Sequence, residues 1–350
     1  MTSLSVVVTF YNNVEHVASA LAQVDALAGD DFELVLLDDG STDGTAELLR
    51  ARARAAPGVK LLVNEKNRGI AESRNRAVLA SSGEYVLFLD CDDAWSPEIV
   101  NRLAERARQS GADVAVCGAA RVYNPGAREG RYIDGRADGE FSGRSAMRLL
   151  LTGAIRGYVW NKLIRRELLL LHPFPKRRAQ EDLAVIIQLI ADGALFSIMS
   201  EVLYWHVERP GSLTNSRIES FESMSTTLIE LERIVSGSME FSGLDSELDY
   251  YRQWAFRNSL VNTAVRLGVT DKALERFVRA LRRETSLRSI LTTARYSRRE
   301  AAIAFLIRFA GACYPRIYRR YRALTHGGRT ERKLPSTGSG ADLNGGVCHG

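Results

Sequence analysis

The chain has 350 residues, 45% of them hydrophobic, and a formal net charge of +5. This composition indicates a globular protein of one large domain or two, and four widely spaced cysteines without a CxxC pair predict neither a zinc site nor a disulfide framework. No apolar run reaches the roughly 20 residues that cross a bilayer. Because the first residues form a strand pattern without a basic leader, we expect a cytoplasmic protein.

The first third of the chain alternates strand-forming apolar runs with helical patterns. Strands are predicted at 5–10, 32–39, 59–65 and 85–90, and helices at 14–28, 45–56 and 70–81. Such alternation indicates βαβ units, and therefore an α/β fold with a mostly parallel sheet and helices on both faces. A helix beginning at Ser96 and Pro97 and a strand over 112–123 follow. From about 218 to 323 the pattern is helical.

Polar residues follow three of these strands, at 12–13, 38–43 and 90–93. In open α/β sheets, ligands bind outside the carboxyl ends of the strands. The three clusters therefore predict a ligand site at one edge of the sheet. The loop FYNN after the first strand lacks the glycine patterns of a dinucleotide fold or a P-loop, so neither is supported.

Three segments at this edge have residue types suited to a nucleotide and a metal ion. A carboxylate in LLDDGSTDGT can accept hydrogen bonds from a pyrimidine imide, although the segment could equally be a turn with an N-cap. Arg74 and Asn75, in a helix that begins near Gly69, could meet an anion; a solvated polar face is the alternative. Asp90 and Asp92 are spaced to share one Mg²⁺ or Mn²⁺, whose remaining ligands would be water and phosphate.

Six motifs in order, VVVTFYN, LLDDGSTDGT, NRGIAESRN, FLDCDD, WNKL and QEDL, resemble those of glycosyltransferase family 2, the inverting enzymes of GT-A fold that use nucleotide-diphospho-sugars. The resemblance covers about residues 3–216. It implies a GT-A catalytic domain over 1–216. The remaining pattern predicts a smaller helical C-terminal region over 217–325 and a disordered tail over 326–350.

The resemblance also implies residue roles. Asp182 would be the catalytic base, and Glu181 would orient the acceptor or hold Asp182; a helix N-cap pair is the alternative for both. The implied contacts to the donor are Phe10, Asn12, Asp38, Asp39, Arg74, Asn75, Asp90, Lys162, Arg209 and Ser212. The implied metal ligands are Asp92, Asp90 and His206, although a lone histidine is often structural. Trp160 would stack on a sugar face.

The implied activity is metal-dependent, inverting transfer of one sugar from a nucleotide-diphospho-sugar, with UDP expected, to a hydroxyl of a glycan or lipid-linked acceptor. Cell-surface polysaccharide or glycolipid synthesis is the expected setting. The missing QxxRW pattern favours single additions over polymerisation. The alternative is a catalytically silent sugar-nucleotide-binding scaffold, although the D-x-D and Asp182 are both present.

The segment from Arg298 to Arg322 is rich in arginine and predicts peripheral contact with an anionic membrane; a packed helix with a solvated basic end is the alternative. Nucleic-acid binding is not expected, because few stacking aromatics lie between these arginines. The sugar, the acceptor, the nucleobase and the oligomeric state are left open by the sequence.

Overall fold

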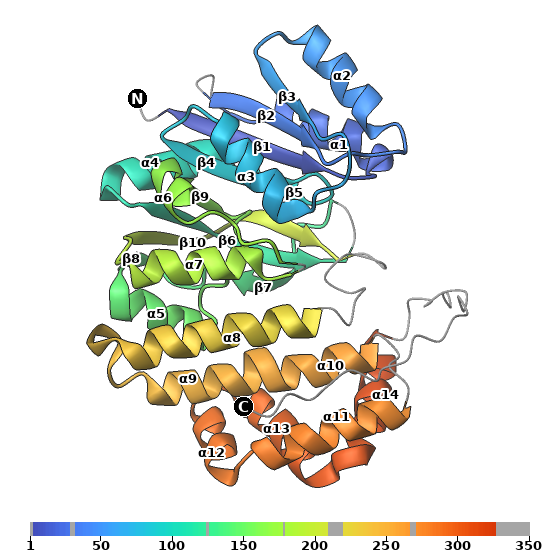
Figure 1. Cartoon of the computed structure of the whole chain (residues 1–350), viewed down its shortest axis with the longest axis vertical. Helices are drawn as coiled ribbons and strands as arrows, with labels where there is room; N and C mark the ends of the chain where they lie inside the picture. The colour runs from blue at the N-terminus through green and yellow to red at the C-terminus, as the bar shows by residue number, and fades with distance from the viewer. Residues whose placement is uncertain are drawn as a thin grey trace.

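A mixed sheet with helices on both faces forms the upper part of the molecule (Figure 1). The computed structural model describes residues 3–28, 32–123, 126–177, 179–208, 220–266 and 271–326. The first part of the chain contains β1 (Leu4–Phe10), α1 (Val14–Asp25), β2 (Phe32–Asp38), α2 (Thr45–Ala55), β3 (Val59–Val63), α3 (Ile70–Ala80), β4 (Tyr85–Asp90), β5 (Ala94–Trp95), α4 (Ile99–Ser110), β6 (Val114–Val122), β7 (Arg131–Asp134), β8 (Gly139–Phe141), α5 (Gly143–Thr152), β9 (Lys162–Arg165), α6 (Arg166–Leu171), α7 (Glu181–Ala191) and β10 (Phe196–Val207).

The strands follow the order β3-β2-β1-β4-β9-β6-β10-β5, with β7 paired to β6 and β8 paired to β10. β3, β2, β1 and β4 are parallel to one another, whereas β9 runs antiparallel between β4 and β6. Phe10 pairs with Asp38, and Thr9 pairs with Asp90. The carboxyl ends of β1, β2 and β4 therefore lie at one edge of the sheet, and the predicted mostly parallel α/β fold is confirmed.

The apolar strand β1 is buried on both faces. Val7 belongs to one hydrophobic core together with residues of α3 and α7, and Val6 and Val8 belong to a second core with residues of α1 and α4. Side chains alternate between the faces of a strand, so a strand covered by helices on both sides must be apolar throughout. This is why polar and apolar residues do not alternate at the centre of the run SVVVTF.

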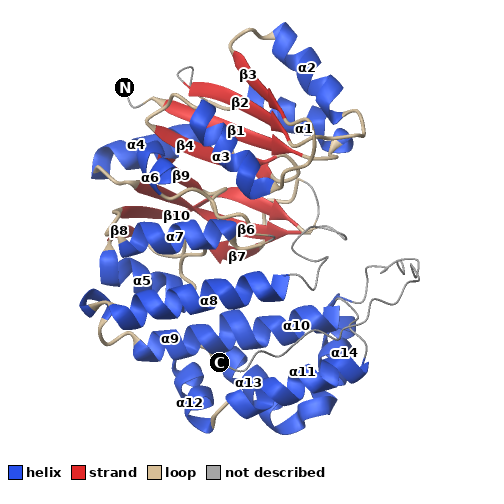
Figure 2. Cartoon of the chain, in the orientation of Figure 1, coloured by secondary structure: helices blue, strands red, loops and turns tan. Residues whose placement is uncertain are grey.

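The helices that follow the sheet lie below it in Figures 1 and 2. They are α8 (Ser220–Gly237), η2 (Met239–Phe241), α9 (Asp245–Tyr251), the π-helical η3 (Arg252–Asn258), α10 (Ser259–Arg266), α11 (Asp271–Glu284), α12 (Leu287–Tyr296), α13 (Arg298–Ala310), η4 (Gly311–Cys313) and α14 (Tyr314–His326). Leu231, Leu244 and Leu248 share one hydrophobic core with the helices of the sheet domain. The first C-terminal helices are thus part of the same packed body.

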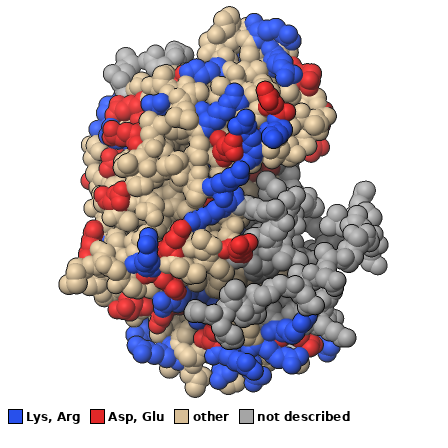
Figure 3. Space-filling view, viewed as in Figure 1, with Lys and Arg blue, Asp and Glu red and all other residues tan. Residues whose placement is uncertain are grey.

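The C-terminal helices are basic on the face that Figure 3 shows, where Lys and Arg side chains gather near the lower end. Exposed arginines of the C-terminal helices include Arg282, Arg283 and Arg288. Within the described ranges, no helix combines the length and the apolar character that a membrane crossing requires. The predicted boundary at 216 lies outside the described residues, as do residues 327–350 of the tail predicted over 326–350; His326 is the last residue of α14.

Candidate active site

The carboxylate of Asp38 ends β2 inside the molecule and has no exposed surface. Its Oδ2 accepts a hydrogen bond from the backbone N–H of Ser41 at 3.1 Å, whereas Oδ1 is buried without a partner among the described residues. A buried acceptor without a donor costs free energy unless a ligand supplies the donor. Phe10 is buried at the paired position of β1. Of the two Asp38 oxygens, Oδ1 is therefore the one that lacks a donor among the described residues.

Asp39 holds the loop that precedes α3. Its Oδ1 accepts hydrogen bonds from Asn64 Nδ2 at 2.7 Å and from the backbone N–H of Arg68 at 2.9 Å, and its Oδ2 accepts one from the backbone N–H of Gly69 at 2.9 Å. Both oxygens thus bind the protein itself. Of the two predicted nucleotide contacts, Asp38 is the one with an oxygen left for a ligand.

Asn12 ties the loop after β1 to the loop after β2. Its Oδ1 accepts from the backbone N–H of Thr42 at 2.8 Å, and its own backbone N–H donates to Ser41 Oγ at 2.9 Å. Asn12 has a φ of 49°, a left-handed conformation in which asparagine is enriched. The side chain of Asn12 therefore shapes the turn beside Asp38.

Arg74 connects two of the predicted motifs. Its side chain is buried, Nη1 donates to Glu181 Oε1 at 3.0 Å, and Nη2 lies 3.4 Å from Asp90 Oδ1. The guanidinium carbon is 5.7 Å from the ring centroids of Phe88 and Phe174. Burial opposes the charge, but Asp90 and Glu181 raise the pKa of Arg74, so it stays a cation between the D-x-D and the QED segment.

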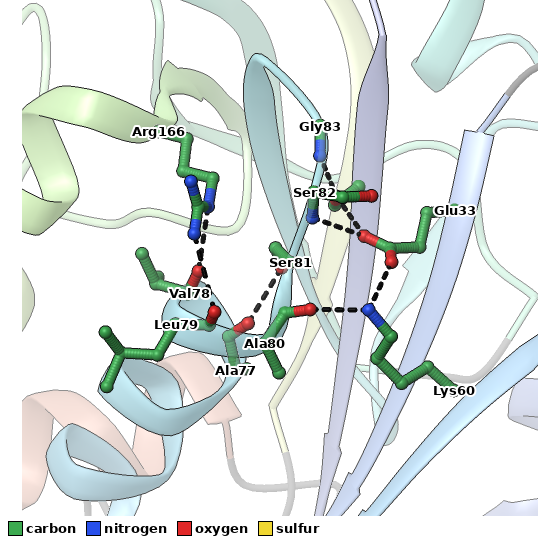
Figure 4. A network of polar contacts seen from close by, with 11 residues as sticks. Glu33, Lys60, Ala77, Val78, Leu79, Ala80, Ser81, Ser82, Gly83 and Arg166 are labelled. Carbon is green, nitrogen blue, oxygen red and sulfur yellow. Dashed lines mark hydrogen bonds and ion pairs between the residues drawn. The ribbon is translucent and has the colours of Figure 1, made fainter.

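The far end of α3 is fixed by cations, as Figure 4 shows. Arg166 Nε donates to the carbonyl oxygen of Val78 at 2.9 Å, and Lys60 Nζ donates to that of Ala80 at 2.6 Å. Cations bind the last carbonyls of a helix favourably because those groups carry its negative partial charge. These contacts hold the helix that positions Arg74.

Asn75, a predicted donor contact, is used within the protein. Its Nδ2 donates to the carbonyl oxygen of Phe174, and its Oδ1 accepts from the backbone N–H of Phe174, both at 2.8 Å. This paired contact fixes the loop before α7 against α3. Asn75 therefore positions Phe174, one of the two rings beside Arg74, instead of facing the sheet edge.

The acidic run after β4 divides into two roles. Asp90 and Asp92 are partly exposed, and Cys91 between them is buried. Burial raises the pKa of Asp90 to about 6; Arg74 opposes this shift, and the charges of Asp93 and Asp92 add to it. Asp93, by contrast, is buried, and both of its carboxylate oxygens bind groups of β10. The crowded negative charge at Asp90 and Asp92 would be relieved by a cation.

Asp93 orients His206. Asp93 Oδ2 accepts from the hydroxyl of Tyr204 at 2.7 Å and lies 3.1 Å from His206 Nδ1, and Oδ1 accepts from the backbone N–H of Val207 at 2.9 Å. Burial by itself would lower the pKa of His206, but the hydrogen bond and the charge of Asp93 have the larger effect. The pKa of His206 is therefore raised. With Nδ1 bound to a carboxylate, Nε2 is the ring atom left for a ligand, as in many metal-binding histidines.

No three His, Cys, Asp or Glu side chains in the described part of the chain lie close enough together to form a complete cation site. The predicted ligands Asp90, Asp92 and His206 therefore do not converge into one. The oxygen donors of Asp90 and Asp92 nevertheless suit Mg²⁺ or Mn²⁺, since such ions keep few protein ligands and take the rest from water and phosphates. The residues fit a metal that arrives with its nucleotide.

Glu181 and Asp182 begin α7. Gln180 before them has a φ of 64°, an unusual backbone conformation for a residue other than glycine. Asp182 Oδ1 accepts from the backbone N–H of Leu183 at 2.7 Å. Burial, and then the negative charge of Glu181, raise the pKa of Asp182 to about 7, against the effect of Arg74. A carboxylate with that pKa is suited to accept a proton near neutral pH.

Lys162, a predicted donor contact, is bound within the protein and is not a free cation. It is fully buried, and its ammonium donates to Asp134 Oδ2 at 2.7 Å and to Asn161 Oδ1 at 2.8 Å. Trp160 is 5% exposed, and the rings of Tyr158 and Tyr204 stack on it at centroid distances of 4.7 and 4.2 Å. Neither a phosphate contact of Lys162 nor a sugar stack of Trp160 is favoured by these positions.

Arg209 and Ser212, two further predicted donor contacts, lie outside the described residues. Sequence reasoning assigned no role to Asp93, Tyr204, Phe174 or Asp134, which position His206, Arg74 and Lys162. Asp93 had a local signal, since it is the third acid of the run LDCDD. The other three had none, because their partners lie far away in the sequence.

The chain is similar in sequence and fold to known proteins. Residues 5–170 match the family model described as glycosyl transferase family 2. A cholesterol galactosyltransferase of Borreliella burgdorferi is 27% identical over 224 residues, which cover 61% of this chain and 62% of that protein. The chain spans 51% to 62% of the length of the first curated relatives.

Two solved structures have the same fold. The crystal structure of S. aureus TarS 1–349 in complex with UDP-GlcNAc has a TM-score of 0.63 and 22% identity, covering 94% of this chain and 93% of that one. The mannosyltransferase PcManGT of Pyrobaculum calidifontis, in complex with GDP-Man and Mn²⁺, has a TM-score of 0.56 and 17% identity, covering 92% and 86%. At these identities the likeness establishes the fold.

Proposed function

Because the chain belongs to glycosyltransferase family 2, we propose that it transfers one sugar, with inversion, from a UDP-sugar to an acceptor hydroxyl. The observation that carries the proposal is the contact of Arg74 with both Glu181 and Asp90. It links the pair Asp90 and Asp92, suited to a metal-bound diphosphate, with Glu181, which precedes the proposed base Asp182. Inverting transfer requires both groups on opposite sides of the anomeric carbon.

The donor would lie along the carboxyl edge of the sheet. Asp38 Oδ1, buried without a partner in the described ranges, would accept the imide N–H of uracil. The diphosphate would lie at the end of β4, where Asp90 and Asp92 would hold Mg²⁺ or Mn²⁺. When bound, the metal would neutralise charge on the departing diphosphate. The complex of a structural neighbour with UDP-GlcNAc supports a uridine donor.

Asp182 would remove the proton from the acceptor hydroxyl. The acceptor oxygen would then attack the anomeric carbon on the face opposite the diphosphate, and the bond from that carbon to the diphosphate oxygen would break. One carboxylate suffices for this single displacement, whereas a glycosidase needs two. Glu181, held by Arg74, would keep the pKa of Asp182 near neutral by its own negative charge.

The acceptor would be a glycan or lipid-linked precursor of a cell-surface polymer or glycolipid. A relative named for galactosyl transfer to cholesterol supports a lipid acceptor. Exposed apolar side chains on α12 and α13 also fit a membrane surface: Leu287 and Leu291 are 60% and 68% exposed, and Phe305 and Phe309 are each 50% exposed. Together with the arginines around them, they would lie on anionic lipid without crossing it.

A panel of UDP-, GDP- and dTDP-sugars tests the proposal by donor hydrolysis in Mn²⁺, Mg²⁺ or EDTA. We expect one UDP-sugar to turn over only with metal, and both Asp92→Asn and Asp182→Asn to abolish turnover. Asp245→Asn changes an exposed carboxylate at the start of α9 and serves as the matched control. Tight nucleotide binding without turnover, even with acceptor extracts, would favour the silent-scaffold alternative.

A further inference from the structure

Three cationic or polar residues form a row at the side of the sheet away from Asp38. Arg121, near the end of β6, pairs in register with His206 on β10 and with Arg131 on β7. Paired residues of neighbouring strands project from the same face of a sheet, roughly 5 Å apart. The side chains of Arg131, Arg121 and His206 therefore stand next to one another across three strands.

Two further arginines belong to this cluster. The backbone N–H of Arg156 donates to the buried Asp134 Oδ1 at 2.7 Å, and its guanidinium carbon lies 4.1 Å from the ring centroid of Trp254. Trp254 belongs to the π-helical segment η3, so a C-terminal element holds Arg156 in place. Arg299, near the start of α13, is the fourth arginine. Burial, and then the charges of Arg299, Arg121 and Arg156, lower the pKa of Arg131.

Like charges at paired strand positions destabilise a sheet, so the cluster needs compensation. Arg121 Nη1 lies 3.3 Å from Glu208 Oε2, and Arg299 Nη1 lies 3.4 Å from Glu300 Oε1. Arg131 and Arg156 have no carboxylate within 4.0 Å in the parts of the chain that the structure describes. Two carboxylates among four guanidinium groups leave excess positive charge, which an anion could neutralise.

The strand order places the cluster past the donor. Four steps of the sheet, β2 to β1, β4, β9 and β6, separate Asp38 from Arg121, or roughly 19 Å at about 4.8 Å per step. Asp90 on β4 lies midway. Burial raises the pKa of Tyr251 to about 12, while Arg156 and Asp182 act on it in opposite directions. Arg156 and the proposed base Asp182 thus both lie near Tyr251.

We propose that Arg121, Arg131, Arg156 and Arg299 bind a phosphate group of the acceptor, so that the reacting hydroxyl faces Asp182. Guanidinium groups present paired N–H donors that match phosphate oxygens. The inference rests on the proposed function, because it requires Asp182 as the base. Two kinds of acceptor share this chemistry: a chain of polyol units joined by phosphodiesters, and a lipid carrier with a terminal pyrophosphate.

The test uses the full chain saturated with UDP and Mg²⁺, so that the nucleotide and its diphosphate site are already filled. Inorganic phosphate, glycerophosphoglycerol and geranyl pyrophosphate are then titrated by calorimetry. The variants are Arg131→Gln with Arg299→Gln, both at exposed positions, and Arg299→Glu as a charge reversal. Arg295→Gln, at an exposed arginine in the last turn of α12, is the matched control.

We expect at least one organic probe to bind more tightly than inorganic phosphate, and the double variant to weaken that binding tenfold or more, a loss typical of charge-assisted hydrogen bonds. Arg299→Glu should weaken it as well, and Arg295→Gln should not. Tighter binding of glycerophosphoglycerol would indicate a polyol phosphate acceptor, and tighter binding of geranyl pyrophosphate a lipid carrier.

The inference is overturned if no probe binds, or if the double variant binds as tightly as Arg295→Gln. Donor hydrolysis by the unaltered chain, measured in parallel, separates this failure from failure of the proposed function. If the unaltered chain turns over a UDP-sugar and the double variant binds the probes as tightly as the unaltered chain, only the proposed acceptor site is contradicted. Absence of turnover for every donor would remove the proposed function itself.

Discussion

Arg74 and Glu181 lie 107 positions apart in the sequence, yet Arg74 Nη1 donates to Glu181 Oε1 at 3.0 Å inside the molecule. The same guanidinium lies 3.4 Å from Asp90 Oδ1. A buried cation between two carboxylates couples their positions, because moving either one leaves a buried charge without its partner. A displacement of the Asp90 carboxylate should therefore also displace Glu181 at the start of α7.

Replacing Arg74 by lysine should lower kcat/KM by about a hundredfold or more, because a compact ammonium cannot bridge two carboxylates as a planar guanidinium does. Arg68→Lys is the matched control, since Arg68, in the loop just before α3, pairs with Glu72 at the surface. Steady-state kinetics with the preferred donor would decide. Equal activities of the two variants would show that the Arg74 bridge has no part in the reaction.

Activity should rise with pH through about 7. Burial and the charge of Glu181 raise the pKa of Asp182 to about 7, and a general base works only when deprotonated. The ascending limb of kcat/KM should therefore have its midpoint near that value. Glu181→Gln removes a neighbouring negative charge, so the midpoint should move to lower pH. If the midpoint of the ascending limb is the same in Glu181→Gln as in the unaltered chain, Asp182 is not the titrating base.

The two aspartates at the end of β2 should respond differently to the same change. Asp38→Asn should weaken UDP binding by about tenfold or more, the range of a hydrogen bond to a charged group, with little loss of thermal stability, because Asp38 Oδ1 has no partner among the described residues. Asp39→Asn should lower the melting temperature instead, since an amide group replaces one of the two carboxylate oxygens that accept from the backbone of Arg68 and Gly69. Calorimetric UDP binding and thermal melts distinguish the two; reversed behaviour would exchange their proposed roles.

The surface of α12 and α13 should bind anionic lipid. Phe305 and Phe309 are each half exposed, and the centroids of their rings lie 4.6 Å apart. The full chain should float with vesicles that contain anionic lipid and not with neutral ones, and Phe305→Ser with Phe309→Ser should reduce the floated fraction severalfold. Leu79→Ser, at an exposed leucine on the sheet domain, is the control. Equal recovery of all three proteins would remove the membrane-contact proposal.

The sequence predicts the parallel half of the sheet well, because β1, β2 and β4 are buried on both faces and read as continuous apolar runs. The short antiparallel strands were missed. β9 has four residues, and β5 has two, so no periodicity is visible. Helix α4 begins at Ile99, after the predicted start at Pro97, although Ser96 Oγ accepts from the backbone N–H of Glu98 as an N-cap side chain does.

Residue chemistry was predictable where a polar group ends a buried strand, as Asp38 and Asp90 do. It was not predictable where a distant partner decides the role. Lys162 looks like a phosphate ligand in the sequence, but Asp134 buries its charge in an ion pair 28 positions away. Asn75 likewise binds the backbone of Phe174. Such pairings leave no local pattern, because they depend on how β7, β9 and α3 pack.

The stereochemistry of donor hydrolysis tests the central claim most directly. Real-time proton NMR of the preferred UDP-α-sugar with metal follows the anomeric signal of the released sugar before mutarotation. Transfer to water by a single displacement predicts the β-anomer first, and no β-anomer from Asp182→Asn. Release of the α-anomer first, or the same rate from Asp182→Asn as from the unaltered chain, would contradict the account.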